Sequence, residues 1–290
     1  MRSIPFASRV LKTALLLLSA LSYEVVAQKP WKGAEVITTQ TFKYGAFEAR
    51  IKSAGGGGII TPFFLWKHNS EIPGQLWQEM DFEIFGRDGS FQSQVMTPGK
   101  VPDDQRTEHV KMHYPSTAAH DRFNTYRMEW TPDSLCFYYN GRLIRKETDK
   151  VEFAKLMDPA QAEEMQLRIG VWAGDYEWSG RFDSTAVPTS AFVNWLQVYS
   201  YTPGSGTGGS NFTPLWRDDF NTLNTNRFWF ANWTFSSAIN DYVATNATAR
   251  DGMLQVAYTH WTQMGTFLPT PEDDGLTPPM IEPLPVDSTP

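Results

Sequence analysis

The sequence predicts an all-β fold, a sandwich or jelly roll of antiparallel strands. Between residues 35 and 201, short alternating stretches rich in Val, Ile, Phe, Tyr and Trp are separated by Gly, Pro, Asn and Asp at intervals of about ten residues. Asn140-Gly141 lies between two of these stretches and is typical of a tight hairpin. Only residues 152–164 have a brief helical pattern. Many strands with few helices in one chain favour two packed sheets.

The clearest strands alternate apolar and polar side chains, which a strand sends to opposite faces of its sheet. In chain order they are 46–52, 77–85, 90–95, 125–130, 168–172 and 192–199. A Gly- and Ser-rich joint at 203–210 reads as a flexible linker. Beyond it, strand patterns at 215–220, 232–235 and 251–258 make up too short a segment for a second domain. We expect them to complete the sheets of the first.

The first residues have the pattern of an export signal. Basic Arg2, Arg9 and Lys12 precede an apolar run at 13–21, and the segment 25–27, Val-Val-Ala, comes before Gln28. We predict a signal peptide at 1–27, cleaved near Ala27, and a secreted protein, extracellular or periplasmic. The apolar run is about half the roughly 20 residues that cross a bilayer, so we expect no membrane span.

The mature chain is expected to comprise a domain at 28–268 and a disordered tail at 269–290, which holds seven prolines and no apolar periodicity. The formal net charge of the whole chain is −7, and loss of the signal makes it more negative. An acidic surface argues against nucleic acid as a partner. Cys136 has no intramolecular disulfide partner and lies in a strand pattern, so we expect a buried apolar residue.

Three acids share one face of the strand at 77–85. Alternation sends Met80, Phe82 and Ile84 to the core, and it sends Trp77, Glu79, Asp81 and Glu83 to the other face. Successive carboxyl groups at a spacing of ~6.6 Å repel one another when ionised, so at least one should keep its proton well above the normal pKa. Such a row costs stability, which suggests that it is used.

A retaining glycosidase uses one carboxylate as nucleophile and a second carboxylic acid as proton donor, with about 5 to 5.5 Å between the carboxyl groups. Glu79 and Glu83 have α-carbons ~13 Å apart on a straight strand, and their side chains can lean toward each other on a concave surface. Asp81 between them can hold a proton in place. The next strand sends Gln92 and Gln94 to the same side, and tryptophans such as Trp172 and Trp178 offer flat surfaces for sugar rings.

These residues resemble glycoside hydrolase family 16. The resemblance covers the strand Trp77-x-Glu79-x-Asp81-x-Glu83 with the following Gly86, the segment 44–50, and the strand 168–172 with Trp178. It implies that Glu79 is the nucleophile, that Asp81 assists it and that Glu83 is the acid/base. It also implies a concanavalin A-like jelly roll of two curved antiparallel sheets.

Within that family the chain resembles the circularly permuted mixed-linkage glucanases, because the strands after the joint look like those that normally open the fold. The implied activity is hydrolysis of β-1,4 bonds that follow a β-1,3-linked glucose. The resemblance implies a β-glucan partner, and we expect no cofactor for catalysis and a monomer. It further suggests a structural calcium ion near Asn194, Asp219 and Gly252. The implied sugar contacts are Phe64, Trp66, Trp77, Gln92, Gln94, Arg168, Trp172, Trp178 and Trp233.

Other readings stay open. The same carboxylates would serve a β-1,3-glucanase, or a xyloglucan hydrolase or transglycosylase. A carbohydrate-binding jelly roll without turnover is a further alternative, although a lectin gains nothing from a row of like charges in its cleft. His109, His113 and His120 lack tight metal spacing, and we expect them at the surface.

Overall fold

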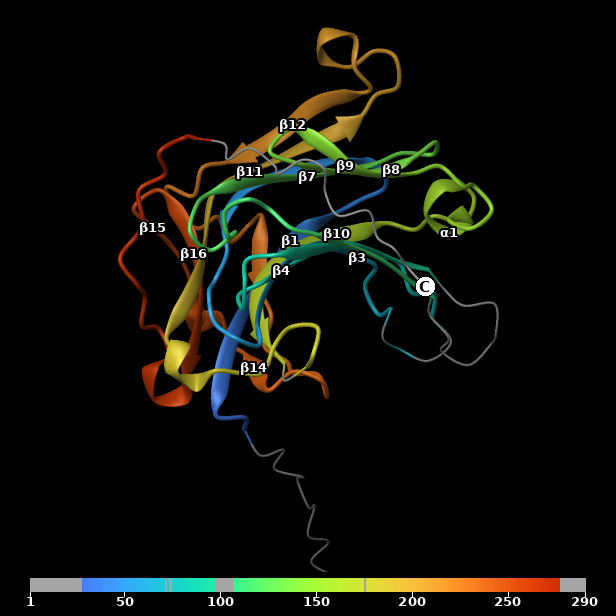
Figure 1. The fold of residues 1–290 in the computed structure, drawn as a ribbon. Coiled ribbons are helices and arrows are strands. Elements are labelled where there is room, and N and C mark those ends of the chain that lie inside the picture. The colour runs from blue at the N-terminus through green and yellow to red at the C-terminus, as the bar shows by residue number, and fades with distance from the viewer. Residues whose placement is uncertain (1–27, 71, 73–74, 98–106, 175, 277–290) are drawn as a thin grey trace, which may run out of the picture.

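A computed structural model describes residues 28–70, 72, 75–97, 107–174 and 176–276. Its strands form two curved layers stacked face to face, as Figure 1 shows. The predicted signal peptide and residues 277–290 of the predicted tail lie outside the described residues. Within the described part, no helix has the length and apolar character needed to cross a membrane.

The inner layer has six neighbouring strands in the order β6-β5-β4-β3-β10-β1, and each pair in it is antiparallel. Their bounds are β1 (Trp31–Phe42), β3 (Ile59–Trp66), β4 (Glu79–Phe85), β5 (Phe91–Thr97), β6 (Thr107–His113) and β10 (Met165–Ala173).

The outer layer follows the order β11-β2-β7-β8-β9, and β16 joins it to β1 of the inner layer. The two layers are therefore one continuous sheet that folds over itself. The bounds are β2 (Gly45–Lys52), β7 (Asn124–Trp130), β8 (Leu135–Tyr139), β9 (Arg142–Glu147), β11 (Thr189–Tyr201) and β16 (Met253–His260).

The strands after the joint pair with strands from the first part of the chain. Strand β12 (Phe212–Asp218) pairs with β11, and β13 (Phe228–Phe230) and β14 (Asn240–Tyr242) pair with β1. Strand β15 (Ala247–Arg250) pairs with β16. This segment therefore shares its sheets and its core with the rest of the domain. The circular permutation itself stays a prediction.

Aromatic and aliphatic side chains fill the space between the layers. Phe82 of β4 lies edge-on against Phe91 of β5 and against Tyr126 and Phe137 of the outer layer. All four are fully buried. Burial of each such side chain contributes about 1.5–3 kcal/mol, so the core fixes which side of β4 faces inward.

Several local predictions are confirmed. Asn140 and Gly141 both have positive φ, at 51° and 78°, as the tight turn between β8 and β9 requires. The predicted helical stretch contains α1 (Ala154–Met157). Cys136 is a buried free cysteine.

The expectation for His113 was wrong. Its ring is fully buried, Nε2 lies 2.9 Å from Oγ of Ser93, and the ring stacks on Phe91. Burial, followed by the charges of Lys111 and Arg145, lowers the pKa of His113 to about 3. The alternation along β6 places this residue on the inward face, which a search for metal spacing does not reveal.

Residues 269–276, predicted to belong to a solvated tail, instead make specific contacts with the outer layer. Asp273 accepts hydrogen bonds from Nε and Nη2 of Arg50, both at 2.6 Å, and from Asn194 at 2.7 Å. Asp274 contacts Arg122. We call residues 269–276 the clasp, because they tie the C-terminal part of the described chain to β2 and β11.

Candidate active site

Strand β4 separates the core from a row of acids. Met80, Phe82 and Ile84 are fully buried in the core between the layers. Glu79 and Glu83 are half-buried, and Asp81 is only 2% exposed. The alternation that the sequence predicted for this strand is confirmed. Directly after the strand, the backbone passes close to another segment, where a Cβ on Gly86 would lie 2.6 Å from the carbonyl oxygen of Gly56.

The register of the neighbouring strands decides which side chains share the acidic face, because directly opposite residues point the same way. On β3, Trp66 lies opposite Glu79 and Phe64 lies opposite Asp81. On β5, Gln94 lies opposite Asp81 and Gln92 lies opposite Glu83. The next strand, β10, places Arg168 opposite Phe64. Residues from four strands thus meet on one face.

Glu79 is held by two neighbours. The indole Nε1 of Trp77 donates a hydrogen bond to Oε2 of Glu79 at 2.8 Å. Asp81 also hydrogen-bonds Glu79. Two carboxyl groups can share a hydrogen bond only when one of them carries a proton. Burial, followed by the charges of Glu79 and Glu83, holds the pKa of Asp81 well above its usual range. The proton therefore belongs to Asp81, which donates to Glu79.

Glu83 also favours its protonated form. Burial raises the pKa of Glu83 to about 8, and the charge of Glu79 adds to the effect. A hydrogen bond from Gln92 opposes this rise. Burial thus favours the protonated forms of Asp81 and Glu83, whereas Glu79 accepts hydrogen bonds from Trp77 and Asp81. This separation of protonation states is what paired acid and nucleophile chemistry requires.

The two glutamines act together beside Glu83. Nε2 of Gln92 donates to Oε2 of Glu83 at 2.5 Å and to Oε1 of Gln94 at 2.6 Å. Both glutamines are buried. Gln94 therefore orients the amide that contacts Glu83.

Arg168 and four other predicted sugar contacts form one group. Its guanidinium lies 6.0 Å from the ring of Phe64, 5.5 Å from Trp66 and 5.7 Å from Trp233. Trp66 packs edge-on against Trp77, with ring centroids 4.7 Å apart. These side chains form an aromatic wall beside Glu79, since Trp77 also contacts that acid.

Two further predicted contacts lie toward the other end of β4. Trp172 lies opposite Ile60, which in turn lies opposite Phe85 at the end of the acidic strand. Trp178 packs edge-on against Phe85 and is tilted against Trp172, and it is 38% exposed. Aromatic surface therefore flanks the acids on both sides.

The sequence analysis did not predict the ion pair between Glu35 and Arg168. Oε1 of Glu35 accepts a hydrogen bond from Nη1 of Arg168 at 3.0 Å, and both residues are buried. Tyr242 also hydrogen-bonds Glu35. Gly170 lies opposite Glu35, and the absence of a side chain there leaves room for the pair. Glu35 lies 133 positions before Arg168, so no local pattern could have linked them.

The residues predicted to hold calcium lie in one region. The ladders of β11 with β12 and β16 pair Leu196 with Asp218 and Val193 with Leu254, and Asp219 and Gly252 follow close to these ends. The Asn194 amide donates to Asp273, however, and Asp219 is paired with Arg217 at 2.7 Å. The side-chain oxygen of Asn194 is not used by this hydrogen bond. Calcium takes about six to eight oxygen ligands. The calcium site stays a prediction.

Comparison with known proteins gives one family match. The model of glycosyl hydrolases family 16 matches residues 11–197. A β-glucanase of Fibrobacter succinogenes is 38% identical over 256 residues, which cover 87% of this chain and 71% of that protein. A β-glucanase of Brevibacillus brevis is 25% identical over 185 residues, which cover 63% of this chain and 65% of that protein, just under two thirds of its length.

Solved structures of similar proteins include the β-glucanase of Bacillus licheniformis, with a TM-score of 0.47, 27% identity, and coverage of 57% of this chain and 70% of that one. The laminarinase catalytic domain of Thermotoga maritima has a TM-score of 0.47 at 22% identity, and covers 58% of this chain and 76% of that one.

Proposed function

The chain belongs to glycosyl hydrolase family 16. We therefore propose that Glu79, Asp81 and Glu83, with the aromatic side chains on either side of them, form the active site of a retaining endo-β-glucanase, which we call the acidic cleft. The proposed substrate is mixed-linkage β-1,3-1,4-glucan, cleaved at β-1,4 bonds. The 38% identity with a protein named β-glucanase supports a β-glucan as the substrate. The observation that carries the proposal is the geometry of β4, where Glu79, Asp81 and Glu83 share one face and burial raises the pKa of Glu83 to about 8.

Glu79 is the proposed nucleophile. It would attack the anomeric carbon and form a covalent glycosyl-enzyme intermediate. The hydrogen bonds from Trp77 and Asp81 hold its carboxylate in one orientation. Positioning of a reacting group in this way lowers the barrier because less freedom is lost in the transition state.

Glu83 is the proposed acid and base. With a pKa of about 8 it is protonated at neutral pH and can protonate the leaving oxygen. The resulting carboxylate would then remove a proton from the water that hydrolyses the intermediate. Once Glu79 is bound to the sugar its charge is gone, which lowers the pKa of Glu83 at the step that needs a base.

The arginine and the aromatic rings would bind the sugar chain. Tryptophan faces bury the flat apolar faces of glucose rings, and the guanidinium of Arg168 offers hydrogen bonds to hydroxyl groups. Trp66 and Trp77 beside Glu79, and Trp172 and Trp178 toward the far end, would place the reacting bond between two aromatic surfaces.

The experiment that tests the proposal is hydrolysis of four polysaccharides: barley β-glucan, lichenan, laminarin and xyloglucan. We expect fast release of oligosaccharides from the first two, with β-anomers formed first by NMR. Preferential cleavage of laminarin would assign a β-1,3-glucanase, and transfer products from xyloglucan would assign a transglycosylase. Binding without any product would assign a non-catalytic sugar-binding protein.

We also propose that the protein is exported. The support is the sequence of residues 1–27 alone, with its basic start and apolar run. N-terminal sequencing of the protein from culture medium or periplasm should begin near Gln28. Recovery from cells only, with Met1 retained, would contradict export.

A further inference from the structure

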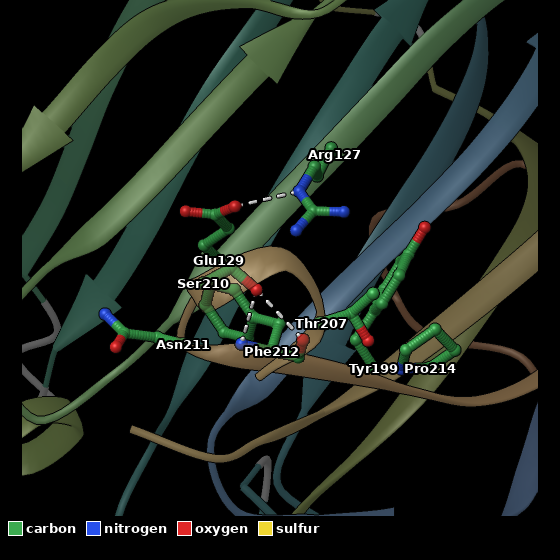
Figure 2. Close-up of a pocket in the computed structure, with 8 residues that line it drawn as sticks. All are labelled: Arg127, Glu129, Tyr199, Thr207, Ser210, Asn211, Phe212 and Pro214. Carbon is green, nitrogen blue, oxygen red and sulfur yellow. Dashed lines mark hydrogen bonds and ion pairs between the residues drawn. The ribbon is translucent and has the colours of Figure 1, made fainter. Parts of the chain in front are cut away.

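A second pocket lies on the opposite side of the molecule from the acidic cleft. Its volume is about 440 Å³, and Figure 2 shows the residues that line it. They come from β7, β11, the joint and β12: Arg127, Glu129, Tyr199, Thr207, Ser210, Asn211, Phe212 and Pro214. Known small-molecule sites have volumes of about 300–1,000 Å³, so the size is that of a ligand site.

The floor of this outer pocket belongs to the outward face of the outer layer. Met128 and Val198, the chain neighbours of Arg127 and Tyr199, are fully buried in the core. Alternation therefore turns Arg127 and Tyr199 away from the core and from the acids of β4. A ligand here could not touch the acidic cleft, and the outer pocket is a separate site.

Arg127 is fixed in place by several contacts. Its Nε donates to Glu129 at 2.9 Å and its Nη1 donates to Glu48 at 3.2 Å. The guanidinium lies over the Tyr199 ring at 4.6 Å and over the Phe212 ring at 5.6 Å. Those two hydrogen bonds use two of the five N–H groups of the guanidinium. A third hydrogen bond goes to the hydroxyl oxygen of Tyr199, so two N–H groups are left to donate to a ligand.

The acceptors of the floor are also held rigidly. The hydroxyl of Tyr199 donates to Glu48 at 3.2 Å, and that of Tyr138 donates to Glu129 at 3.1 Å. Each carboxylate oxygen can accept a further hydrogen bond. A site that is rigid before binding loses little conformational entropy when a ligand arrives.

The joint provides the opposite wall. Gly206 donates to Ser210 and lies so close to β12 that a Cβ there would be 2.4 Å from the backbone nitrogen of Phe212. This contact keeps Thr207, Ser210 and Asn211 beside the floor. The rim therefore offers hydroxyl and amide groups, while Pro214 and the aromatic rings offer apolar surface.

The charges of the outer pocket select a neutral ligand. Two carboxylates and one guanidinium leave a net charge of −1, so an anion would be repelled by Glu48 and Glu129. A cation would have to compete with Arg127, which already pairs with both acids. Planar polar groups next to apolar ring surface suit a polyol with many hydroxyls, such as a sugar chain. We propose that the outer pocket is a second binding site for a β-glucan chain, apart from the cleft.

The proposal rests on the glucanase function for the identity of the sugar. In a polymer of many repeats, a second contact on the same chain raises the local concentration of substrate near the enzyme. Loss of the outer pocket should therefore slow hydrolysis of the polymer but not hydrolysis of a short oligosaccharide that only fills the cleft.

Titration calorimetry with a mixed-linkage hexasaccharide tests the site on the full chain carrying E79Q, so that the ligand is not cleaved. We expect two sites per chain in E79Q and one in E79Q with Tyr199→Ala. Trp261→Ala removes another exposed aromatic residue, 53% exposed and outside both sites, and should leave two. One site in E79Q, or two sites that survive Tyr199→Ala, would overturn the proposal.

A second pair of measurements guards against misfolding of the Tyr199 variant. Ser210, at the end of the joint, and Asn211, directly after it, are both exposed. Ser210→Ala with Asn211→Ala should weaken the second site about tenfold with an unchanged circular dichroism spectrum. In the protein with Glu79 intact, this double change should lower the rate of polymer hydrolysis. The rate of hydrolysis of a chromogenic trisaccharide should stay the same. An equal effect on both substrates would count against the outer pocket. No hydrolysis of any glucan by the unaltered protein would instead refute the glucanase function.

Discussion

Nε2 of Gln92 lies 2.5 Å from Oε2 of Glu83, and the same nitrogen lies 2.6 Å from Oε1 of Gln94. A donor next to a carboxylate stabilises the charged form. Gln92 thus opposes the burial that raises the pKa of Glu83 to about 8.

Replacement of Gln92 by Leu should move the basic limb of kcat/KM to higher pH. The activity needs protonated Glu83, so it falls as pH rises through the pKa of Glu83. Without the hydrogen bond that lowers this pKa, the fall begins later. The measurement is a pH profile on a soluble oligosaccharide. Met96→Leu on the same strand, half-buried opposite Glu79, should leave the limb where it is. A shift to lower pH in Q92L would contradict the assignment of Glu83.

Removal of either outer glutamate should lower kcat by about 10⁴-fold or more, as loss of a nucleophile does in other enzymes. Added azide distinguishes the two roles. In Glu79→Ala, azide attacks the anomeric carbon directly and yields the α-azide. In Glu83→Ala with an activated substrate, the covalent intermediate still forms, and azide attack on it yields the β-azide. NMR of the products identifies the anomer, and the opposite pairing would exchange the two roles.

Glu35→Gln should lower stability by about 1–3 kcal/mol and raise KM more than it lowers kcat. The glutamine keeps a hydrogen bond to Arg168 but removes the charge that balances it in a buried place. The guanidinium of Arg168 would then be less well ordered next to the rings of Phe64, Trp66 and Trp233. Thermal unfolding and steady-state kinetics check the two effects. A fall in kcat alone would place Glu35 in the chemistry instead.

Asp273→Asn should destabilise the protein by about 1–3 kcal/mol at neutral pH, because it weakens the buried bidentate contact with Arg50. Burial raises the pKa of Asp273, but hydrogen bonds from Arg50, Asn194 and the Gly275 backbone outweigh it, and the pKa is lowered. A carboxyl group whose pKa is lower in the folded state stabilises the fold at any pH above its pKa in the unfolded state. This stabilisation is lost as the pH falls through the pKa of the folded state.

The stability difference between wild type and Asp273→Asn should therefore shrink in acid and disappear below the folded pKa of Asp273. Asp274→Asn is the matched control. Its ion pair with Arg122 is exposed on both sides and screened by solvent, so the change should cost much less than Asp273→Asn. No loss of stability in Asp273→Asn would show that the clasp has no role in stability.

The sequence pattern was sufficient for the features that depend on neighbouring residues. Alternation along 77–85 predicted the two faces of β4, and Asn140-Gly141 predicted a hairpin. The positions of Gln92 and Gln94 followed from the same alternation one strand later. In each case the geometry of the strand or turn fixes the side chains without reference to distant residues.

The features that sequence reasoning missed are contacts between distant segments. Glu35 meets Arg168 only because β1 and β10 are neighbours, and Asp273 reaches Arg50 across 223 positions. His113 is buried because the outer layer covers the inward face of β6. The order of strands in the sheets determines these contacts, and no local pattern contains that order.

The two faces of β4 also protect the register of the sheet. If β4 slipped by one residue against β3 and β5, Glu79, Asp81 and Glu83 would enter the apolar layer, and Met80, Phe82 and Ile84 would be exposed. Burial of unpaired carboxyl groups and loss of three core side chains would together destabilise the slipped form by many kcal/mol. The same acids that are proposed to cleave the substrate therefore select a single pairing of the strands during folding.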